Sequence, residues 1–300
     1  MQYVIGVDAG GTSTEVGVYS LKGSHLYQTK TGFGNLLNDR KKAIYNILEG
    51  IKRVFERFEK SECCLVVIGS AGIDTGDNKD YLKNHVYEQF KIEVSVINDA
   101  QLAHFALLED KDGCLVISGT GSVVYGYFNN EMYRVGGWGH LLGDEGSGYS
   151  IVVSLIKDIL FKCDANMPLS QLENEFLNHL DIKNALKLAR FVYDSKKDNI
   201  AKNALFVSKM AEEGDKQARI LLKDAGIELA RQVRLLLNRV NLNNHINVAV
   251  TGSVLLHNDY VYHTFTEELI KTSQTINFIR KEMSNTKGSY YYFLQNNTVK

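Results

Sequence analysis

Short apolar runs alternate with glycine-containing turns through the first third of the chain. Between these runs, longer stretches repeat their apolar residues at the spacing of an amphipathic helix. Strands are expected at residues 3–7, 15–19, 25–29, 64–69 and 92–97, and helices at residues 39–58, 79–90 and 100–108. This order predicts an α/β domain whose sheet begins with an antiparallel meander.

The same pattern begins again at Cys114. Three further strands are expected at residues 114–118, 123–128 and 132–135, and a late strand at residues 246–251. Between them, residues 147–240 are nearly all helical in pattern, with breaks at Pro168, at 194–199 and at Gly214-Asp215. The repeat predicts a duplicated architecture with a cleft between the halves, and a second domain enlarged by helices. We expect domains at residues 1–112 and 113–300.

Composition narrows the class of ligand. The 300 residues are 44% apolar and 23% charged, and the formal net charge is −1. Basic residues are spread along the chain, which disfavours nucleic acid and anionic membranes as partners and favours a small molecule. No apolar run approaches the roughly 18 residues of a membrane helix, so the cytoplasm is the expected compartment. The four Cys fit neither a zinc site nor a disulfide framework.

Residues 8–14, Asp-Ala-Gly-Gly-Thr-Ser-Thr, form a polar turn between two expected strands. Glycines let backbone N–H groups approach an anion closely, and hydroxyls add donors, so the turn suits phosphate. Asp8 could hold Mg²⁺ through the water shell of the ion. The alternative is an ordinary β-hairpin turn.

Residues 118–122, Ser-Gly-Thr-Gly-Ser, repeat this composition between another pair of strands. A polyphosphate that lies in a cleft needs donors from both walls, so two such turns at equivalent places support a phosphate site more than one does. No Lys follows the second turn, which excludes a Walker A loop. A hairpin turn is again the alternative.

Asn98-Asp99 ends an apolar strand and precedes a helix, the edge where open α/β sheets place their ligands. A carboxylate there can take a proton from a hydroxyl that attacks phosphorus. The alternative is a helix N-cap.

Residues 136–148 hold six glycines and Trp138, the only tryptophan. Glycine in this number suggests backbone lying close to a ligand, with Asp144 and Glu145 as acceptors for sugar hydroxyls. The alternatives make Trp138 a core residue and Asp144-Glu145 a capping pair for the helix near Ser147. Residues 251–253, Thr-Gly-Ser, suit a turn against a flat ring such as adenine.

Together these motifs resemble the N-acetylglucosamine kinases of the BadF-type ATPase family, within the superfamily of actin, sugar kinases and heat-shock chaperones. The resemblance implies two ribonuclease-H-like domains with an interdomain cleft that closes by a hinge motion. It implies ATP and Mg²⁺ as cofactors, with Asp8 at the metal and Asp99 as the base. The implied ATP-binding residues are Gly10, Gly11, Thr12, Gly119, Thr120, Gly121, Gly252 and Ser253. The implied sugar-binding residues are Asn35, Asp99, Gly137, Trp138, Gly139 and Asp144.

The resemblance weakens at the C-terminus, where the family usually ends in a small-residue stretch and a helix packed on the first domain. Residues 164–199 match no motif, so N-acetylmuramic acid or glucosamine could replace N-acetylglucosamine as acceptor, and a homodimer is left open. Two other functions are a dehydratase-activating ATPase, which needs thiolates for an iron-sulfur cluster, and a non-catalytic sugar or nucleotide sensor. Retained Asp99 argues against the sensor.

Overall fold

The computed structural model describes residues 1–109, 111–129, 131–240, 245–272 and 275–297. The chain divides into two compact units. Unit 1 consists of Met1–Lys111 together with Met283–Lys300, and unit 2 consists of Asp112–Glu282. The C-terminal residues, which we expected in the second domain, therefore belong to the first unit.

Unit 1 is built on a five-stranded sheet of order β3-β2-β1-β4-β5. Its strands are β1 (Tyr3–Ala9), β2 (Thr14–Ser20), β3 (His25–Thr31), β4 (Cys63–Ser70) and β5 (Val94–Asn98). The first three strands pair antiparallel, and β4 and β5 continue the sheet in parallel with β1. The carboxyl ends of β1, β4 and β5 consequently meet at one edge of the sheet.

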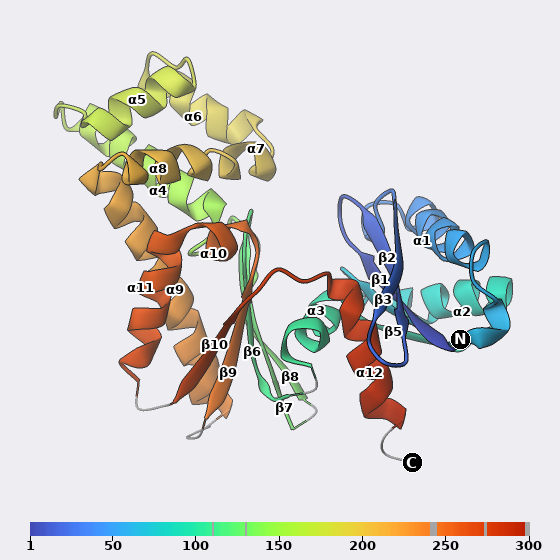
Figure 1. Cartoon of the computed structure of the whole chain (residues 1–300). Coiled ribbons are helices and arrows are strands. Elements are labelled where there is room, and N and C mark those ends of the chain that lie inside the picture. The colour runs from blue at the N-terminus through green and yellow to red at the C-terminus, as the bar shows by residue number, and fades with distance from the viewer. Residues whose placement is uncertain (110, 130, 241–244, 273–274, 298–300) are drawn as a thin grey trace. The chain divides into compact units, whose positions relative to one another are not determined.

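Helices cover both faces of this sheet (Figure 1). Alternation along β1 explains the layers, because Ile5 packs on one side and Val4 on the other. Helices α1 (Arg40–Phe55) and α2 (Asn78–Phe90) cover the Ile5 face. Helices α3 (Asp99–Leu108) and α12 (Gly288–Asn297) cover the Val4 face and pack on each other. Two short 3₁₀ helices are η1 (Lys60–Glu62) and η2 (Asn285–Lys287).

Unit 2 repeats the same sheet topology. Its strand order is β10-β9-β6-β7-β8, formed by β6 (Gly113–Ser118), β7 (Ser122–Phe128), β8 (Glu131–Gly136), β9 (Ile246–Thr251) and β10 (Ile276–Arg280). Strands β6, β7 and β8 pair antiparallel, whereas β9 and β10 run parallel to β6. Each strand thus has a counterpart in unit 1, and the predicted duplication is confirmed.

Helices of unit 2 fall into two groups. The long helix α9 (Lys216–Val240) lies along β6, β7 and β8 and packs against α11 (Asp259–Ile270), beside the short α10 (Ser253–His257). The others gather at one end of the sheet (Figure 1): α4 (Gly148–Asp164), α5 (Gln171–His179), α6 (Ala185–Asp194), α7 (Lys197–Ala201) and α8 (Ala204–Glu212). One continuous apolar core joins these helices to the sheet. The predicted enlargement of the second half by helices is confirmed.

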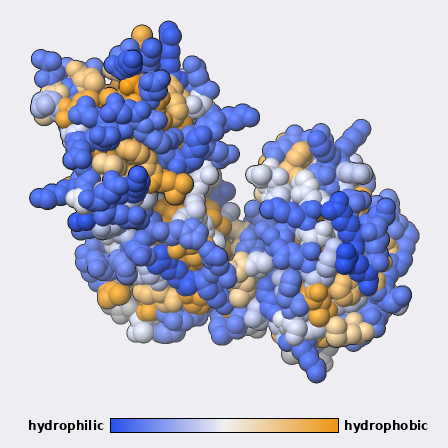
Figure 2. Space-filling view, turned by 45° about the horizontal axis from the view of Figure 1, so that its top comes forward, coloured by the Kyte–Doolittle hydropathy of each residue, from blue (hydrophilic) through white to orange (hydrophobic). Residues whose placement is uncertain are grey.

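Hydrophilic residues cover most of the face shown in Figure 2, and hydrophobic residues appear there in separate groups. Across the part of the chain that the structure describes, we find no helix with both the length and the apolar character to cross a membrane.

Candidate active site

The first polar turn lies at the carboxyl edge of the unit 1 sheet, between β1 and β2. It is closed by a hydrogen bond from the Gly10 amide to the Ser13 carbonyl oxygen, 3.0 Å. Gly11 and Thr12 are exposed, and a methyl group on Gly11 would meet nothing within 4 Å. The backbone of the turn is therefore open to a ligand on its outer side.

Asn35 lies beside this turn. Its amide N–H donates to the carbonyl oxygen of Gly10 at 3.1 Å, next to a similar bond from Gly34 at 2.9 Å. The side-chain oxygen of Asn35 accepts from the Leu37 amide at 2.9 Å, which fixes the side chain against its own loop. The structure thus brings Asn35 and Gly10 together from separate parts of the sequence.

Two carboxylates, Asp8 and Asp99, stand at the same edge. Burial raises the pKa of Asp8 to about 6, and the nearby charge of Asp99 adds to the effect. A hydrogen bond from the Asn285 amide nitrogen to Asp8 Oδ2, 2.9 Å, acts in the opposite direction. A positive charge bound beside these two carboxylates would relieve both burial and repulsion. Among the residues that the structure describes, no group of three or more His, Cys, Asp or Glu side chains could hold a metal ion, so a cation here would need further ligands from water or a substrate.

The helix cap at this edge is Asn98, whose side-chain oxygen accepts from the Ala100 amide at 2.9 Å. Asp99 is the first residue of α3, so the capping alternative for Asp99 is not needed, although its Oδ1 also accepts from Ala100. The Asn98 amide in turn donates to Asp74 at 2.8 Å. Burial raises the pKa of Asp99, and the negative charge of Asp74 raises it further.

The second polar turn joins β6 to β7 and is bonded to the start of α4. The Gly119 amide donates to the Gly121 carbonyl at 2.9 Å, and the Gly119 carbonyl accepts from Gly148 at 2.8 Å. The hydroxyls of Ser118 and Ser122 donate to backbone oxygens of the glycine-rich loop, at 2.7 and 2.6 Å. These bonds hold the turn rigidly, as a preorganised anion site requires.

Gly252 and Ser253 lie directly against this turn. Gly252 has a φ of +89°, and a methyl group on it would come within 2.6 Å of the Ser118 carbonyl carbon. Only glycine meets both conditions. A methyl group on Gly119 would lie 3.6 Å from the Ser253 hydroxyl. Residues 119 and 252, distant in sequence, thus form one surface in unit 2.

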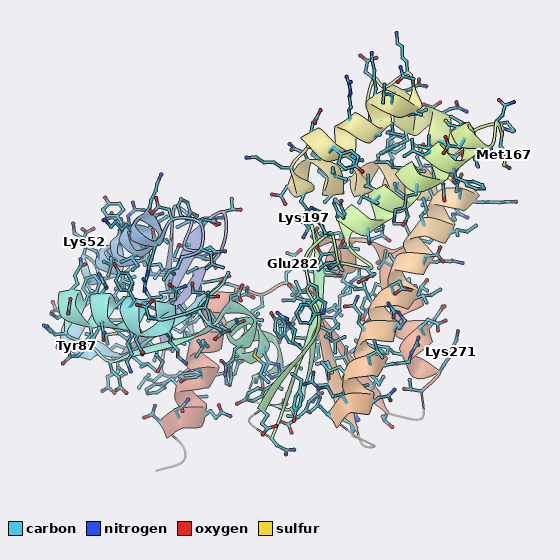
Figure 3. The ribbon with its side chains drawn as sticks, turned by 180° about the vertical axis from the view of Figure 1, so that it is seen from behind. Lys52, Tyr87, Met167, Lys197, Lys271 and Glu282 are labelled. Atoms are coloured by element: carbon cyan, nitrogen blue, oxygen red, sulfur yellow. The ribbon has the colours of Figure 1, made fainter. Side chains whose placement is uncertain are left out.

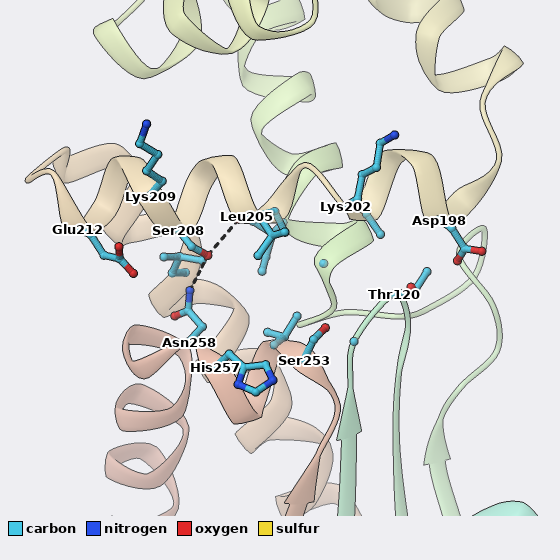
Figure 4. A pocket seen from close by; sticks show the side chains of 17 residues that line it. Thr120, Asp198, Lys202, Leu205, Ser208, Lys209, Glu212, Ser253, His257 and Asn258 are labelled. Atoms are coloured by element: carbon cyan, nitrogen blue, oxygen red, sulfur yellow. Dashed lines mark hydrogen bonds between the residues drawn. The ribbon is translucent and has the colours of Figure 1, made fainter. Parts of the chain in front are cut away.

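A cavity of about 520 Å³ opens from this surface and is bounded by α7, α8 and α10 (Figure 4). Its volume suits a drug-sized or nucleoside-sized ligand. Gly119, Thr120 and Ser253 line one end, and Leu205 and Lys209 lie on the side formed by α8. Asn258 at the far wall caps α11 and donates to the Ser208 hydroxyl at 2.7 Å.

The glycine-rich loop, residues 136–148, owes several of its glycines to packing. A methyl group on Gly137 would lie 2.7 Å from Val123, and one on Gly146 would lie 2.5 Å from Leu229; both residues have positive φ. Gly139 also has positive φ but faces open space. Conformation and close packing therefore account for glycine at 137 and 146 without a ligand.

Trp138 is 65% exposed, with the Arg134 guanidinium 4.2 Å from its ring centroid. The alternative that makes it a core residue is therefore wrong. The helix after the loop, α4, is capped by Ser147 and Ser150, so the capping pair Asp144-Glu145 is also wrong.

Asp144 is only 3% exposed and has a left-handed backbone with φ of +67°. Its Oδ1 accepts from the Ser122 amide at 3.2 Å. The Lys197 ammonium lies 2.6 Å from Oδ2, without the geometry of a directed hydrogen bond, so the contact is an ion pair. Lys197 begins α7, where the helical group meets the strand ends of unit 2 (Figure 3). The sugar-binding residue expected at 144 is thus enclosed and paired.

Three polar residues of the site escaped the sequence motifs: Asp74, Lys197 and Asn285. Each contacts a motif residue that is distant in sequence: Asp74 accepts from Asn98, Lys197 pairs with Asp144, and Asn285 donates to Asp8. The only local signal was the polarity of residues 194–199, where we expected a break and the structure has the first residues of α7.

The sequence matches a family of ATPases. Residues 5–283 match the model of the BadF/BadG/BcrA/BcrD ATPase family, and the chain belongs to this family. The resemblance seen in the motifs is thereby confirmed.

Particular relatives are named as kinases of amino sugars. The chain is 32% identical to the N-acetylmuramic acid/N-acetylglucosamine kinase of Clostridium acetobutylicum over 276 residues, which cover 88% of this chain and 89% of the relative. It is 30% identical to the N-acetyl-D-glucosamine kinase of Dictyostelium discoideum, with 80% of each chain covered. The crystal structure of a putative N-acetylglucosamine kinase from Porphyromonas gingivalis has the same fold, with a TM-score of 0.74 at 21% identity over 99% of this chain and 100% of that one.

Proposed function

We propose that this protein is an ATP-dependent amino-sugar kinase that converts N-acetylglucosamine to its 6-phosphate. The observation that carries the proposal is the placement of Asp99, a desolvated carboxylate beside an open glycine turn at the carboxyl edge of the unit 1 sheet. The names of the two relatives support amino sugars as acceptors, and N-acetylmuramic acid is the second acceptor that they suggest.

In the proposed reaction, the oxygen of the sugar 6-hydroxyl attacks the γ-phosphorus of ATP, and Asp99 accepts the proton of this hydroxyl. The new O–P bond forms while the bond from the γ-phosphorus to the β,γ-bridging oxygen breaks, and ADP leaves with that electron pair. Asp99 is suited to this task because burial raises its pKa toward the pH at which the enzyme works.

For the nucleotide, we propose that ATP phosphates bind the turn at Gly10, Gly11 and Thr12 in unit 1 and the turn at Gly119, Thr120 and Gly121 in unit 2. Ser253, which follows Gly252, lines the cavity of about 520 Å³ in unit 2, and we propose that this cavity takes the adenosine with contacts from both residues. Support for this placement comes from the contact between residues 119 and 253 and from the size of the cavity.

For the metal, we propose that Asp8 and the phosphates of ATP hold Mg²⁺, with water between carboxylate and ion. The residues fit, because Asp8 is desolvated and faces a second carboxylate. A bound Mg²⁺ would neutralise charge on the phosphate oxygens.

For the sugar, we propose contacts with Asn35, Asp99, Gly137, Trp138, Gly139 and Asp144. The open side of Gly139 and the exposed ring of Trp138 leave this part of the loop free for a ligand. Asp144 could reach a sugar hydroxyl only if the Lys197 side chain moves aside or shares it.

The proposal is tested by incubating the full chain with Mg-ATP and, separately, N-acetylglucosamine, N-acetylmuramic acid, glucosamine and glucose. Mass spectrometry and ³¹P NMR should identify a 6-phosphate of an N-acetylated amino sugar, with little ATP consumed when no sugar is present. Equal ATP hydrolysis with and without every sugar would reject a kinase.

A further inference from the structure

The segment that follows unit 2 in sequence packs against one face of the unit 1 sheet, at two glycines. Gly6 on β1 and Gly17 on β2 are directly paired across the two strands. A methyl group on Gly6 would come within 2.8 Å of the Thr286 carbonyl carbon, and one on Gly17 within 3.0 Å of Thr286 Cβ. Two facing glycines therefore make room for Thr286, which is fully buried.

Thr286 and its neighbour Ser284 fix the backbone on both sides of Asn285. The Thr286 hydroxyl lies 2.8 Å from the Tyr19 hydroxyl and 2.6 Å from that of Ser284. Ser284 also donates to a carboxylate oxygen of Glu15 on β2. The segment at residues 284–286 is thus held against both strands that flank the first polar turn.

Asn285 uses this fixed position to reach Asp8. Its Nδ2 donates to Asp8 Oδ2 at 2.9 Å, across a separation of 277 residues in sequence. An amide NH₂ group only donates, so the bond occupies one carboxylate oxygen and leaves the other for a different partner. Two structural roles in this segment belong to other residues. Thr286 is the buried side chain, and Ser284 is the N-cap of η2. The bond to Asp8 is therefore the contact that the Asn285 side chain makes.

We propose that Asn285 is a positioning residue that orients the Asp8 carboxylate for metal-bound nucleotide. This inference rests on the proposed function, in which Asp8 serves the Mg²⁺ of ATP. The amide fixes Oδ2 and leaves Oδ1 for the metal-bound nucleotide, as residues behind a metal-binding side chain commonly do. The last segment of the chain thereby completes the phosphoryl-transfer site of unit 1.

The test compares Asn285→Ala and Asn285→Asp with the matched control Asn296→Ala. Asn296 lies in the same C-terminal segment, and its amide donates to the Tyr292 carbonyl at 2.8 Å on an exposed helix face. Binding of Mn²⁺ with a non-hydrolysable ATP analogue is followed by electron paramagnetic resonance. Steady-state kinetics give kcat, the KM for sugar and the dependence on Mg²⁺. Thermal unfolding reports the folded state of each variant.

We expect Asn285→Ala to weaken Mn²⁺ binding in the ternary complex by about 10-fold and to lower kcat by about 10- to 100-fold. The KM for sugar should stay unchanged, and raised Mg²⁺ should partly restore the rate. Asn285→Asp keeps the size of the side chain and should be worse, because a third carboxylate replaces the donor. Asn296→Ala should match the wild type in every measurement.

Wild-type Mn²⁺ affinity in a folded Asn285→Ala would overturn the inference. Loss of stability, nucleotide binding and sugar binding together in both Asn285 variants would also overturn it, because that result marks a purely structural bond. A wild-type protein that binds no metal-nucleotide at all would instead reject the proposed function.

Discussion

The ammonium of Lys197 lies 2.6 Å from the carboxylate of Asp144 and covers the second polar turn, so closely that a methyl group on Gly121 would come within 2.5 Å of it. One ion pair therefore connects α7 to both the second polar turn and the glycine-rich loop. The proposed function uses Gly121 of the turn and Asp144 of the loop, and Lys197 of α7 contacts both.

Lys197→Met leaves a buried carboxylate without its partner. It should destabilise unit 2 by about 2 kcal/mol, less than the roughly 3–5 kcal/mol of a fully buried pair, because the Lys197 side chain is 29% exposed. Asp144→Asn should cost less, and the double variant should recover most of the loss. A double-mutant cycle in urea measures the coupling. Additive effects would show that the two side chains do not interact in solution.

Asp144→Ala should raise the KM for sugar more than the KM for ATP, since the proposed function places Asp144 at the sugar. Parallel saturation curves for both substrates measure the two constants. The exposed pair Arg231–Glu228, 2.8 Å apart on α9, supplies a control in Arg231→Ala. An equal rise in both KM values would remove Asp144 from the sugar site.

Asp99→Asn should lower kcat by about 10²- to 10⁴-fold, the usual contribution of a positioned base, while ATP still binds. Coupled kinetics beside nucleotide titration separates the two effects. Asp77→Asn is the matched control, because Asp77 is exposed and contacts Arg40 at 2.8 Å. An unchanged kcat in Asp99→Asn would reject Asp99 as the base.

The rate should fall on the acid side at a pH above the ordinary range of aspartate, because burial raises the pKa of both Asp99 and Asp8. The two carboxylates interact, so the fall reports the pair. Asp74→Asn removes a negative charge that raises the pKa of Asp99, and it should move the acid limb to lower pH. A pH profile of kcat/KM for both proteins decides this, and coincident acid limbs would contradict it.

Asp8→Asn should stabilise the protein at pH 7.5. The pKa of Asp8 is raised to about 6 in the folded state from 3.8, so between these values the folded state binds more protons and stability falls as pH rises. Neutralising the residue should recover up to about 3 kcal/mol at pH 7.5 and almost nothing at pH 4. Urea unfolding at both pH values measures the difference, and a gain that is the same at both would contradict the assignment.

Much of the fold could be predicted because strands and glycine turns depend on residues that are close together in the sequence. The apolar runs at 3–7, 64–69 and 246–251 lie within β1, β4 and β9, and the turns at Gly10 and Gly119 lie between strands as expected. The breaks at Pro168 and Gly214 also fall between helices. Period and turn chemistry are enough for such elements.

Other elements depend on contacts that no local pattern records. Strand β10 is short and only half-buried, so it lacks a run of apolar residues. Helix α12 contains three successive tyrosines, which favour strands, yet its rings pack against α3 and the sheet. Tertiary packing overrides propensity there, and the pairs Lys197–Asp144 and Asn285–Asp8 depend on the same long-range folding.

The contact of Gly6 and Gly17 with Thr286 joins parts of the chain that are synthesised first and last. A ribosome finishes the first two strands early, but Thr286, which fills the hollow between these glycines, is translated only after every residue of unit 2. Until then the apolar side of β1 that α12 will cover has only α3 against it. Unit 1 therefore cannot complete its fold until residues 283–297 have been synthesised, and a nascent chain stopped at Glu282 would leave that apolar face without α12.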